Sequence, residues 1–155
     1  MCPIRPAEES DLPRLVEILT ATYEGTMAAI VPPKALEAFR TGNEATRFAK
    51  ACWPRFHVAE RDGVVAGLLF VEGNRVESLH VHPDHARLGV GAALLSFGEQ
   101  LIALTHDTAE LDVLAGNANA LAFYRSKGWV EVQDFIGREV GDVPAPMIQM
   151  SKRLP

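Results

Sequence analysis

The chain contains little of what several classes of protein require. Its 155 residues include only two cysteines, Cys2 and Cys52, which are far apart and form no metal-ligand spacing. We therefore expect free thiols rather than a disulfide framework. No apolar run approaches the ~20 residues that cross a bilayer, and the N-terminal residues lack the apolar core of a signal peptide. These absences predict a cytoplasmic protein without a membrane partner.

A surplus of positive charge is also missing. The formal net charge is -5, which argues against a general nucleic-acid binder because such proteins normally carry a basic patch. An acidic surface can instead steer cationic amines. Apolar residues make up 48% and charged residues 23% of the chain, as in ordinary globular proteins. A chain of this length buries one sizeable core, so we expect a single domain over residues 1–155.

The most informative segment runs from residue 81 to residue 95. An apolar strand ends at Val81, a polar turn follows, and Gly89-x-Gly91 precedes a segment that is typical of a helix. Glycines let a ligand approach the main chain closely, and the unpaired N–H groups of a helix start attract phosphate. The segment therefore predicts a phosphorylated cofactor, although a tight strand-to-helix turn would give the same local pattern.

Two known nucleotide-binding motifs also place a glycine-rich loop before a helix, but neither matches this sequence. A Walker loop would place a lysine and a hydroxyl after the second glycine, but Ala92 and Ala93 follow Gly91. A dinucleotide fingerprint would place a third glycine where Leu94 stands.

A second segment, residues 117–129, favours the cofactor-binding interpretation of the first. Together the two segments resemble the GNAT (GCN5-related) N-acetyltransferase superfamily, whose second motif runs Asn-x-x-Ala-x-x-Phe-Tyr-x-x-x-Gly followed by an aromatic residue. The resemblance covers at least residues 56–152. The residues in register with the second motif are Asn117, Ala120, Phe123, Tyr124, Gly128 and Trp129.

The resemblance implies acetyl-CoA as the cofactor. The family's cofactor loop begins with Gln or Arg, but Ala86 fills that position here and Arg87 follows one place later. The main-chain cradle needs no particular side chain at that position, so we expect it to persist from about Arg87 to Ala92. The residues expected to bind the cofactor are Leu79, His80, Val81, Arg87, Leu88, Gly89, Val90, Gly91, Ala92, Asn117, Ala120, Phe123 and Tyr124.

Acetyl transfer needs a proton for the leaving thiolate and a base for the amine. In the family that the chain resembles, the tyrosine at the position of Tyr124 is the usual general acid; the alternative is a packing residue with its hydroxyl at the surface. Candidate bases are Glu77, His80 and His82. We favour Glu77, which shares strand parity with Leu79 if the strand is regular, although a bulge would reverse that assignment and a water relay could replace the side chain.

A metal site is not expected. The spacing His80-x-His82-x-x-His85 could bind zinc, but alternate strand residues face opposite ways and Pro83 turns the chain before the last histidine. We also read Asp112 as a structural residue or one at the sheet end.

The pattern of elements predicts an α/β (α+β) fold. We expect a mixed, mostly antiparallel sheet of six to seven strands flanked by about four helices, GNAT-like. Ser10 or Asp11 is expected to cap the first helix and Asn117 to cap the last one. Residues 23–33 are expected to form a loop, and Gly137, Gly141 and Pro144 to lie in a closing loop. The expected strands are 3–6, 56–60, 64–71, 75–81, 110–114, 129–132 and 146–152, and the other expected helical regions are 33–51, 91–105 and the segment from Asn117 to Gly128.

The functional hypothesis is an acetyl-CoA-dependent N-acetyltransferase that moves an acetyl group directly to a primary amine of a small molecule, amino acid or peptide. The alternative is a non-catalytic acyl-CoA-binding or sensing domain, or an unrelated binder of a phosphorylated ligand. The sequence names neither the acceptor nor the oligomeric state, and a homodimer stays open.

Overall fold

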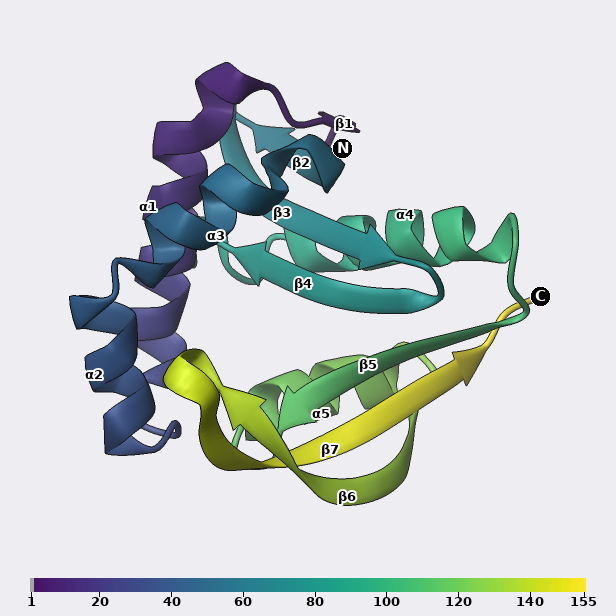
Figure 1. Cartoon of the computed structure of the whole chain (residues 1–155). Helices are drawn as coiled ribbons and strands as arrows, with labels where there is room; N and C mark the ends of the chain where they lie inside the picture. The colour runs from purple at the N-terminus through teal and green to yellow at the C-terminus, as the bar shows by residue number, and fades with distance from the viewer. Residues whose placement is uncertain (1) are drawn as a thin grey trace.

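The computed structural model describes residues 2–155, which form a seven-stranded sheet in the order β1-β2-β3-β4-β5-β7-β6 (Figure 1). Neighbouring strands are antiparallel except β4 and β5, which run parallel. The predicted fold class, a mixed and mostly antiparallel sheet flanked by helices, is confirmed. The strands are β1 (Ile4–Pro6), β2 (Phe56–Arg61), β3 (Val64–Glu72), β4 (Arg75–Val81), β5 (Thr108–Leu114), β6 (Val130–Glu139) and β7 (Val143–Arg153).

Helices cover both faces of the sheet and bury a separate apolar cluster on each (Figure 1). On one face Leu15 and Ile18 of α1 are fully buried with residues of α2 and α3, and on the other face Leu94 of α4 packs with Leu121 of α5. No helix in the described residues is both long and apolar enough to cross a membrane. The α-helices are α1 (Leu12–Thr22), α2 (Pro33–Thr41), α3 (Glu44–Cys52), α4 (Val90–Ala103) and α5 (Ala118–Ser126).

The sheet opens between its two parallel strands. The ladder between β4 and β5 has a single matched pair, Arg75 with Glu110, at the start of both strands. There the Arg75 guanidinium donates to Glu110 at 3.2 Å and to Asp112 at 2.6 Å. Beyond this point the strands diverge toward their C-terminal ends (Figure 1). The divergence leaves main-chain groups of both strands facing an opening in the middle of the sheet.

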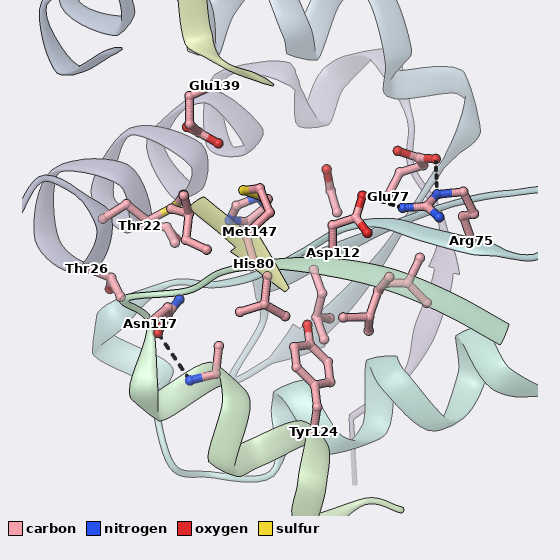
Figure 2. Close-up of a pocket in the computed structure, with 18 of the residues that line it drawn as sticks. Thr22, Thr26, Arg75, Glu77, His80, Asp112, Asn117, Tyr124, Glu139 and Met147 are labelled. Carbon is pink, nitrogen blue, oxygen red and sulfur yellow. Dashed lines mark hydrogen bonds and ion pairs between the residues drawn. The ribbon is translucent and has the colours of Figure 1, made fainter. Parts of the chain in front are cut away.

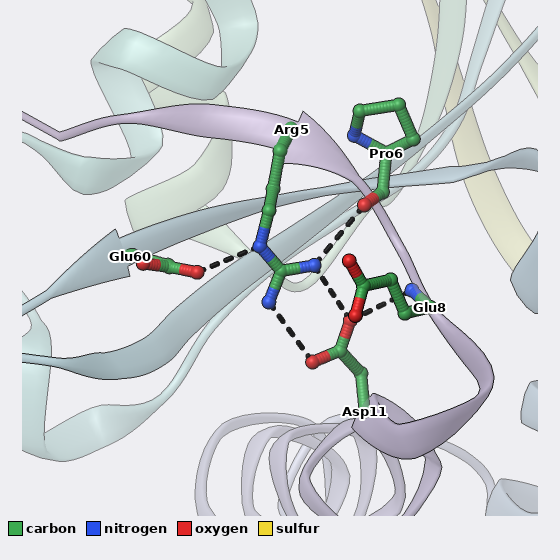
Figure 3. Close-up of polar contacts among 5 residues, drawn as sticks. All are labelled: Arg5, Pro6, Glu8, Asp11 and Glu60. Carbon is green, nitrogen blue, oxygen red and sulfur yellow. Dashed lines mark hydrogen bonds and ion pairs between the residues drawn. The ribbon is translucent and has the colours of Figure 1, made fainter.

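An arginine network fixes the start of α1 against the sheet (Figure 3). Arg5 of β1 donates to both carboxylate oxygens of Asp11, at 2.8 and 3.0 Å, and to Glu60 of β2 at 2.6 Å. This arginine lowers the pKa of Asp11. The pairs are partly exposed, so each contributes modestly, but together they hold the helix whose C-terminal end reaches the opening in the sheet.

The start of α1 is not capped by a side chain as predicted. Asp11 does precede the helix, but its side chain caps no helical N–H group. It accepts instead from the main-chain N–H of Glu8 at 2.8 Å and from Arg5, and Ser10 lies within a short 3-10 turn, Glu9–Asp11. The carboxylate is therefore occupied by a charged partner, and Pro13 in the first turn lowers the number of helical N–H groups that need a cap.

Three predicted segments are corrected. Residues 23–33 are not a plain loop, because Tyr23–Met27 continue α1 as a π-helix. The single helical region 33–51 is two helices, broken at Asn43, which has a left-handed φ of 53°. Gly137 and Pro144 lie inside β6 and β7, so only Val140–Asp142 connect the two strands. Little of β6 is buried, so its sequence contains polar residues and glycine instead of an alternating apolar pattern. The full length of the two strands was therefore not predicted.

One close approach sets the position of α4. A Cβ on Gly67 of β3 would stand 2.9 Å from the Leu94 Cδ1 atom and 2.9 Å from the carbonyl oxygen of His80. Only glycine allows this contact. The first turns of α4 are thereby held against the sheet, directly beside the end of β4.

Candidate active site

A cleft occupies the opening between β4 and β5 and divides into two chambers of about 390 Å³ each. The loop chamber lies under the start of α4, and the strand chamber lies between the diverging strands. The chambers are continuous, because both are lined by Thr22, Thr26, Leu79, His80, Asn117, Ala120 and Tyr124.

The loop chamber is built around the N-terminus of α4. Gly89, the residue before the helix, has a φ of 84°, and Arg87 has a φ of 60°. These left-handed residues turn the chain so that the helix begins at Val90 with its first N–H groups unpaired within the helix. A backbone nest of this kind at a positive helix end binds anions.

Gly91 leaves space in the same chamber. A Cβ at this position would lie 3.6 Å from Val81 and 3.7 Å from Phe123, which are ordinary contact distances. The packing of the protein itself therefore does not require glycine here. Gly91 lines the chamber, so a side chain would occupy room that a ligand could use.

Most residues that the sequence proposed for the cofactor lie in this cleft. The side chain of Val90 is instead fully buried in the core, and Leu88 is 48% exposed outside the lining. These two could offer only main-chain groups. The remaining eleven line the loop chamber: Leu79, His80, Val81, Arg87, Gly89, Gly91, Ala92, Asn117, Ala120, Phe123 and Tyr124.

Asn117 lies where β5 gives way to α5. Its Oδ1 accepts from the N–H of Ala120 at 3.1 Å, which is the predicted N-cap (Figure 2). Since the cap uses only the oxygen, the two N–H donors of the amide stay available to the cleft. Asn117 can therefore cap the helix and hold a ligand at the same time.

Tyr124 of α5 points its hydroxyl up into the strand chamber (Figure 2). Its ring packs edge-on against Phe123 and Trp129, with centroids 5.2 and 6.0 Å away. Burial raises the pKa of the phenol to about 12. The hydroxyl is therefore a protonated donor at every physiological pH, and it does not lie at the outer surface as the packing alternative supposed.

Three buried polar side-chain atoms in residues 2–155 have no hydrogen-bond partner: Thr22 Oγ1, His80 Nδ1 and His85 Nδ1. All three residues line the cleft. Buried polar atoms are almost always paired in folded proteins, so this grouping indicates a ligand with polar atoms along its length. Together with the space at Gly91, it shows that the cleft suits a long, polar, phosphorylated cofactor such as acetyl-CoA.

The candidate base Glu77 lies at a bulge in β4. Phe70 pairs with Ser78 and Val71 with Val76, so Glu77 is left unpaired. Glu77 and Leu79 would share a face of a regular strand, but the bulge changes this, since Val76 packs in the same core cluster as Leu79. Glu77 lines the strand chamber, is exposed, and lies 3.4 Å from the Nε atom of Arg75.

The turn at Pro83 brings His82 and His85 together, with ring centroids 6.4 Å apart and the rings edge to face. His80 lies at the junction of the chambers, and burial lowers its pKa to about 4, so the ring is neutral at pH 7. His82 accepts the N–H of Asp84 on its Nδ1 atom at 3.1 Å and lines neither chamber. Across residues 2–155 no group of three or more potential ligands could hold a metal ion.

Residues outside the two sequence motifs complete the strand chamber. Glu139, at the end of β6, points toward it from above (Figure 2), and the Tyr23 hydroxyl donates to its Oε2 at 3.3 Å. Burial raises the pKa of both groups. Asp112, treated as structural, also lines the chamber. Glu139 belongs to no local motif. Tyr23, Glu24 and Met27 fall where the first helix was expected to give way to a loop, and the resemblance implies that this region borders the acceptor pocket.

The cleft thus joins the diverging parallel strands, the glycine-rich start of α4 and the protonated phenol of Tyr124, which is the arrangement that the resemblance to the acetyltransferases implies. Residues 27–154 match the family described as acetyltransferase (GNAT) domain. The chain therefore belongs to the GNAT family of acetyltransferases, as its two motifs indicated, and acetyl-CoA is the acetyl donor of that family.

Relatives and solved structures agree with this assignment. A mycothiol acetyltransferase of Clavibacter sepedonicus is 45% identical over 71 residues, which are 43% of this chain and 23% of that protein. The match thus spans less than a quarter of the curated relative. A GCN5-related N-acetyltransferase from Rhodopseudomonas palustris superposes with a TM-score of 0.84 at 24% identity, over 99% of this chain and 96% of that one. The yncA protein of Salmonella typhimurium, solved with its cofactor acetyl-CoA, gives a TM-score of 0.71 at 21% identity, over 100% of this chain and 95% of that one.

Proposed function

We propose that residues 1–155 form one N-acyltransferase domain that transfers the acetyl group of acetyl-CoA directly to a primary amine of a small molecule, amino acid or peptide. The observation that carries this proposal is the position of Tyr124, a protonated phenol directed into a cleft whose other end is an anion-binding helix start. A domain that only bound or sensed acyl-CoA would have no use for a proton donor there.

The residues divide the work between the two chambers. Main-chain N–H groups from Arg87 to Ala92 would hold the pyrophosphate, and the Asn117 amide would hold the pantetheine arm. When bound, acetyl-CoA supplies an activated thioester. Val81 and Phe123 provide an apolar wall for its arm.

Proton transfers complete the reaction. The amine nitrogen forms a bond to the acetyl carbon while the carbon–sulfur bond breaks. Tyr124 gives its proton to the departing sulfur, and Glu77 takes the proton that the amine loses. Glu77 is the proposed base because it lines the same chamber as Tyr124 and is exposed enough to exchange its proton with water. His80 is a weaker candidate, since burial lowers its pKa to about 4.

The experiment is a panel of primary amines assayed for release of free thiol from acetyl-CoA, alongside calorimetry with coenzyme A. We expect saturable coenzyme A binding and amine-dependent thiol release. Binding without turnover on any amine would identify a sensing domain, and no binding would refute the cofactor site. On the best amine, Glu77→Gln should lower kcat by ~10²–10⁴, the usual contribution of a general base; an unchanged kcat would exclude Glu77 as the base.

A further inference from the structure

A side pocket of about 240 Å³ continues from the strand chamber into the space between the sheet and the first three helices. Met27, Ser78, His80 and Glu139 line both spaces, so an acceptor could extend from one into the other. The wall of the side pocket is mainly apolar and is formed by Leu19, Tyr23, Phe39, Phe48 and Val140. A dry apolar cavity of ~150 Å³ holds benzene in another protein, so this pocket is large enough for an aryl or branched alkyl group.

Two carboxylates line this side pocket, Glu44 and Glu139. Glu44 of α3 lies 3.9 Å from Arg47 and lines the side pocket alone, whereas Glu139 also lines the strand chamber. Glu139 is partly buried, and no lysine or arginine of residues 2–155 lies within ion-pair distance of it. The neighbouring Arg138 instead lies 3.6 Å from Asp142. A buried carboxylate normally has a charged or hydrogen-bonded partner. Its one side-chain partner here is the Tyr23 hydroxyl at 3.3 Å, which leaves room for a cation from a ligand.

The position of Tyr23 depends on an irregular piece of helix. The π-helix Tyr23–Met27 follows α1 directly, and such insertions are frequent at functional sites. The Tyr23 ring stacks on Phe39 with centroids 4.0 Å apart and planes 4° apart. The stack fixes the hydroxyl that holds Glu139, so the apolar wall and the carboxylate are built as one unit.

We infer that the acceptor is a primary amine attached to an aryl or branched aliphatic group, and that Glu139 is a specificity-determining residue that binds its amino group. The apolar group occupies the side pocket. The amino group lies beside Glu139, at the boundary with the strand chamber that contains Tyr124. This inference rests on the proposed acetyltransferase function and narrows its acceptor class.

The experiment compares kcat/KM for amines that differ in their attached group. 2-Phenylethylamine and 3-methylbutylamine are the apolar probes, and glucosamine, ethanolamine and spermidine are the polar ones. We expect the apolar amines to be at least about tenfold better. If the polar amines are equal or better, the inference is overturned while the proposed function stands. If the protein binds coenzyme A but acetylates no amine, both fail.

Variants test the carboxylate separately. Glu139→Gln should raise KM for 2-phenylethylamine at least about tenfold and leave coenzyme A affinity unchanged, with a smaller effect on kcat. Asp134→Asn is the matched control, because it removes an exposed carboxylate from the same strand. Tyr23→Phe keeps the stacked ring and deletes only the hydroxyl, and it should raise the same KM by a few-fold. An unchanged KM in both Glu139→Gln and Tyr23→Phe would refute the role of Glu139, and if Glu139→Gln does not fold, an unchanged KM in Tyr23→Phe alone does so.

Discussion

The two ends of the cleft are made in different ways. At the loop end, the proposed binding groups are main-chain N–H groups at the start of α4, and Gly89 and Gly91 lie two residues apart in the sequence. At the other end, the two side chains that face the acceptor are Tyr23 and Glu139. They are hydrogen-bonded to each other although they lie 116 residues apart in the sequence. A local turn creates the first site, whereas packing of distant elements creates the second. The cofactor end is therefore recognisable from a short motif, and the acceptor end is not.

The largest expected effect tests the residue between the two ends. Tyr124→Phe keeps the ring contacts with Phe123 and Trp129 and removes only the proton donor. General acid catalysis is typically worth ~10²–10⁴ in rate, so kcat should fall by about that factor. Because burial raises the pKa of Tyr124 to about 12, the ratio of the two rates should stay constant from pH 6 to pH 10.

The measurement is kcat under conditions where chemistry limits the rate, with melting temperature and acetyl-CoA affinity as controls. Both controls should be unchanged. Wild-type turnover in Tyr124→Phe would show that Tyr124 is a packing residue and that solvent supplies the proton.

A second variant breaks the loop end alone. Gly91→Glu places a negative charge and bulk where the phosphates would lie, and like charges brought together cost several kcal/mol. We expect coenzyme A affinity to fall by about 100-fold or more in calorimetry. Gly91→Ala is the matched control: its Cβ makes only ordinary contacts, 3.6 Å from Val81, so affinity should change far less. Unchanged affinity in a folded Gly91→Glu protein would place the phosphate site elsewhere.

His80 connects the two ends, and its effect should appear in the stability. Burial lowers its folded-state pKa from 6.5 to about 4, so the unfolded chain takes up a proton at a higher pH than the folded chain. The free energy of unfolding is therefore highest above pH 6.5, where His80 is neutral in both states. It decreases as the pH falls toward 4, because the unfolded chain binds the proton first. One pKa unit corresponds to about 1.4 kcal/mol, which gives a loss on the order of 2–3 kcal/mol.

Urea unfolding at pH 7 and pH 4.5 measures this loss. His80→Asn should be less stable at neutral pH but should lose less free energy of unfolding between the two pH values. An equal loss in both proteins would mean that His80 is solvated enough to keep its ordinary pKa.

The smallest effect separates the two roles of Asn117. Asp is as good an N-cap as Asn, so Asn117→Asp should keep the melting temperature while removing the N–H donors and adding a negative charge. We expect coenzyme A affinity to fall about tenfold, the equivalent of one hydrogen bond to a ligand. Asn117→Ala should in addition lose about 1 kcal/mol of stability. If Asn117→Asp binds coenzyme A as well as the wild type, Asn117 is only a helix cap.

The sequence by itself determined the elements whose signals are local. The strand Arg75–Val81 has the predicted bounds, and the α4 start at Val90 and the Asn117 cap follow from residues within a few positions of each other. Periodicity, glycine at a positive φ and capping act over one or two turns, so they can be recognised without knowing the partner elements. The same locality made the GNAT motifs recognisable and their membership in one cleft predictable.

Only the tertiary structure decided the acceptor end. The bulge at Glu77, the π-helix at Tyr23 and the long hairpin that brings Glu139 over the cleft depend on how strands register and how helices pack. Each of these residues is ordinary in its own segment. Their chemistry arises from burial and from neighbours far along the chain, because desolvation and the approach of a partner set the pKa and the charge balance of a side chain.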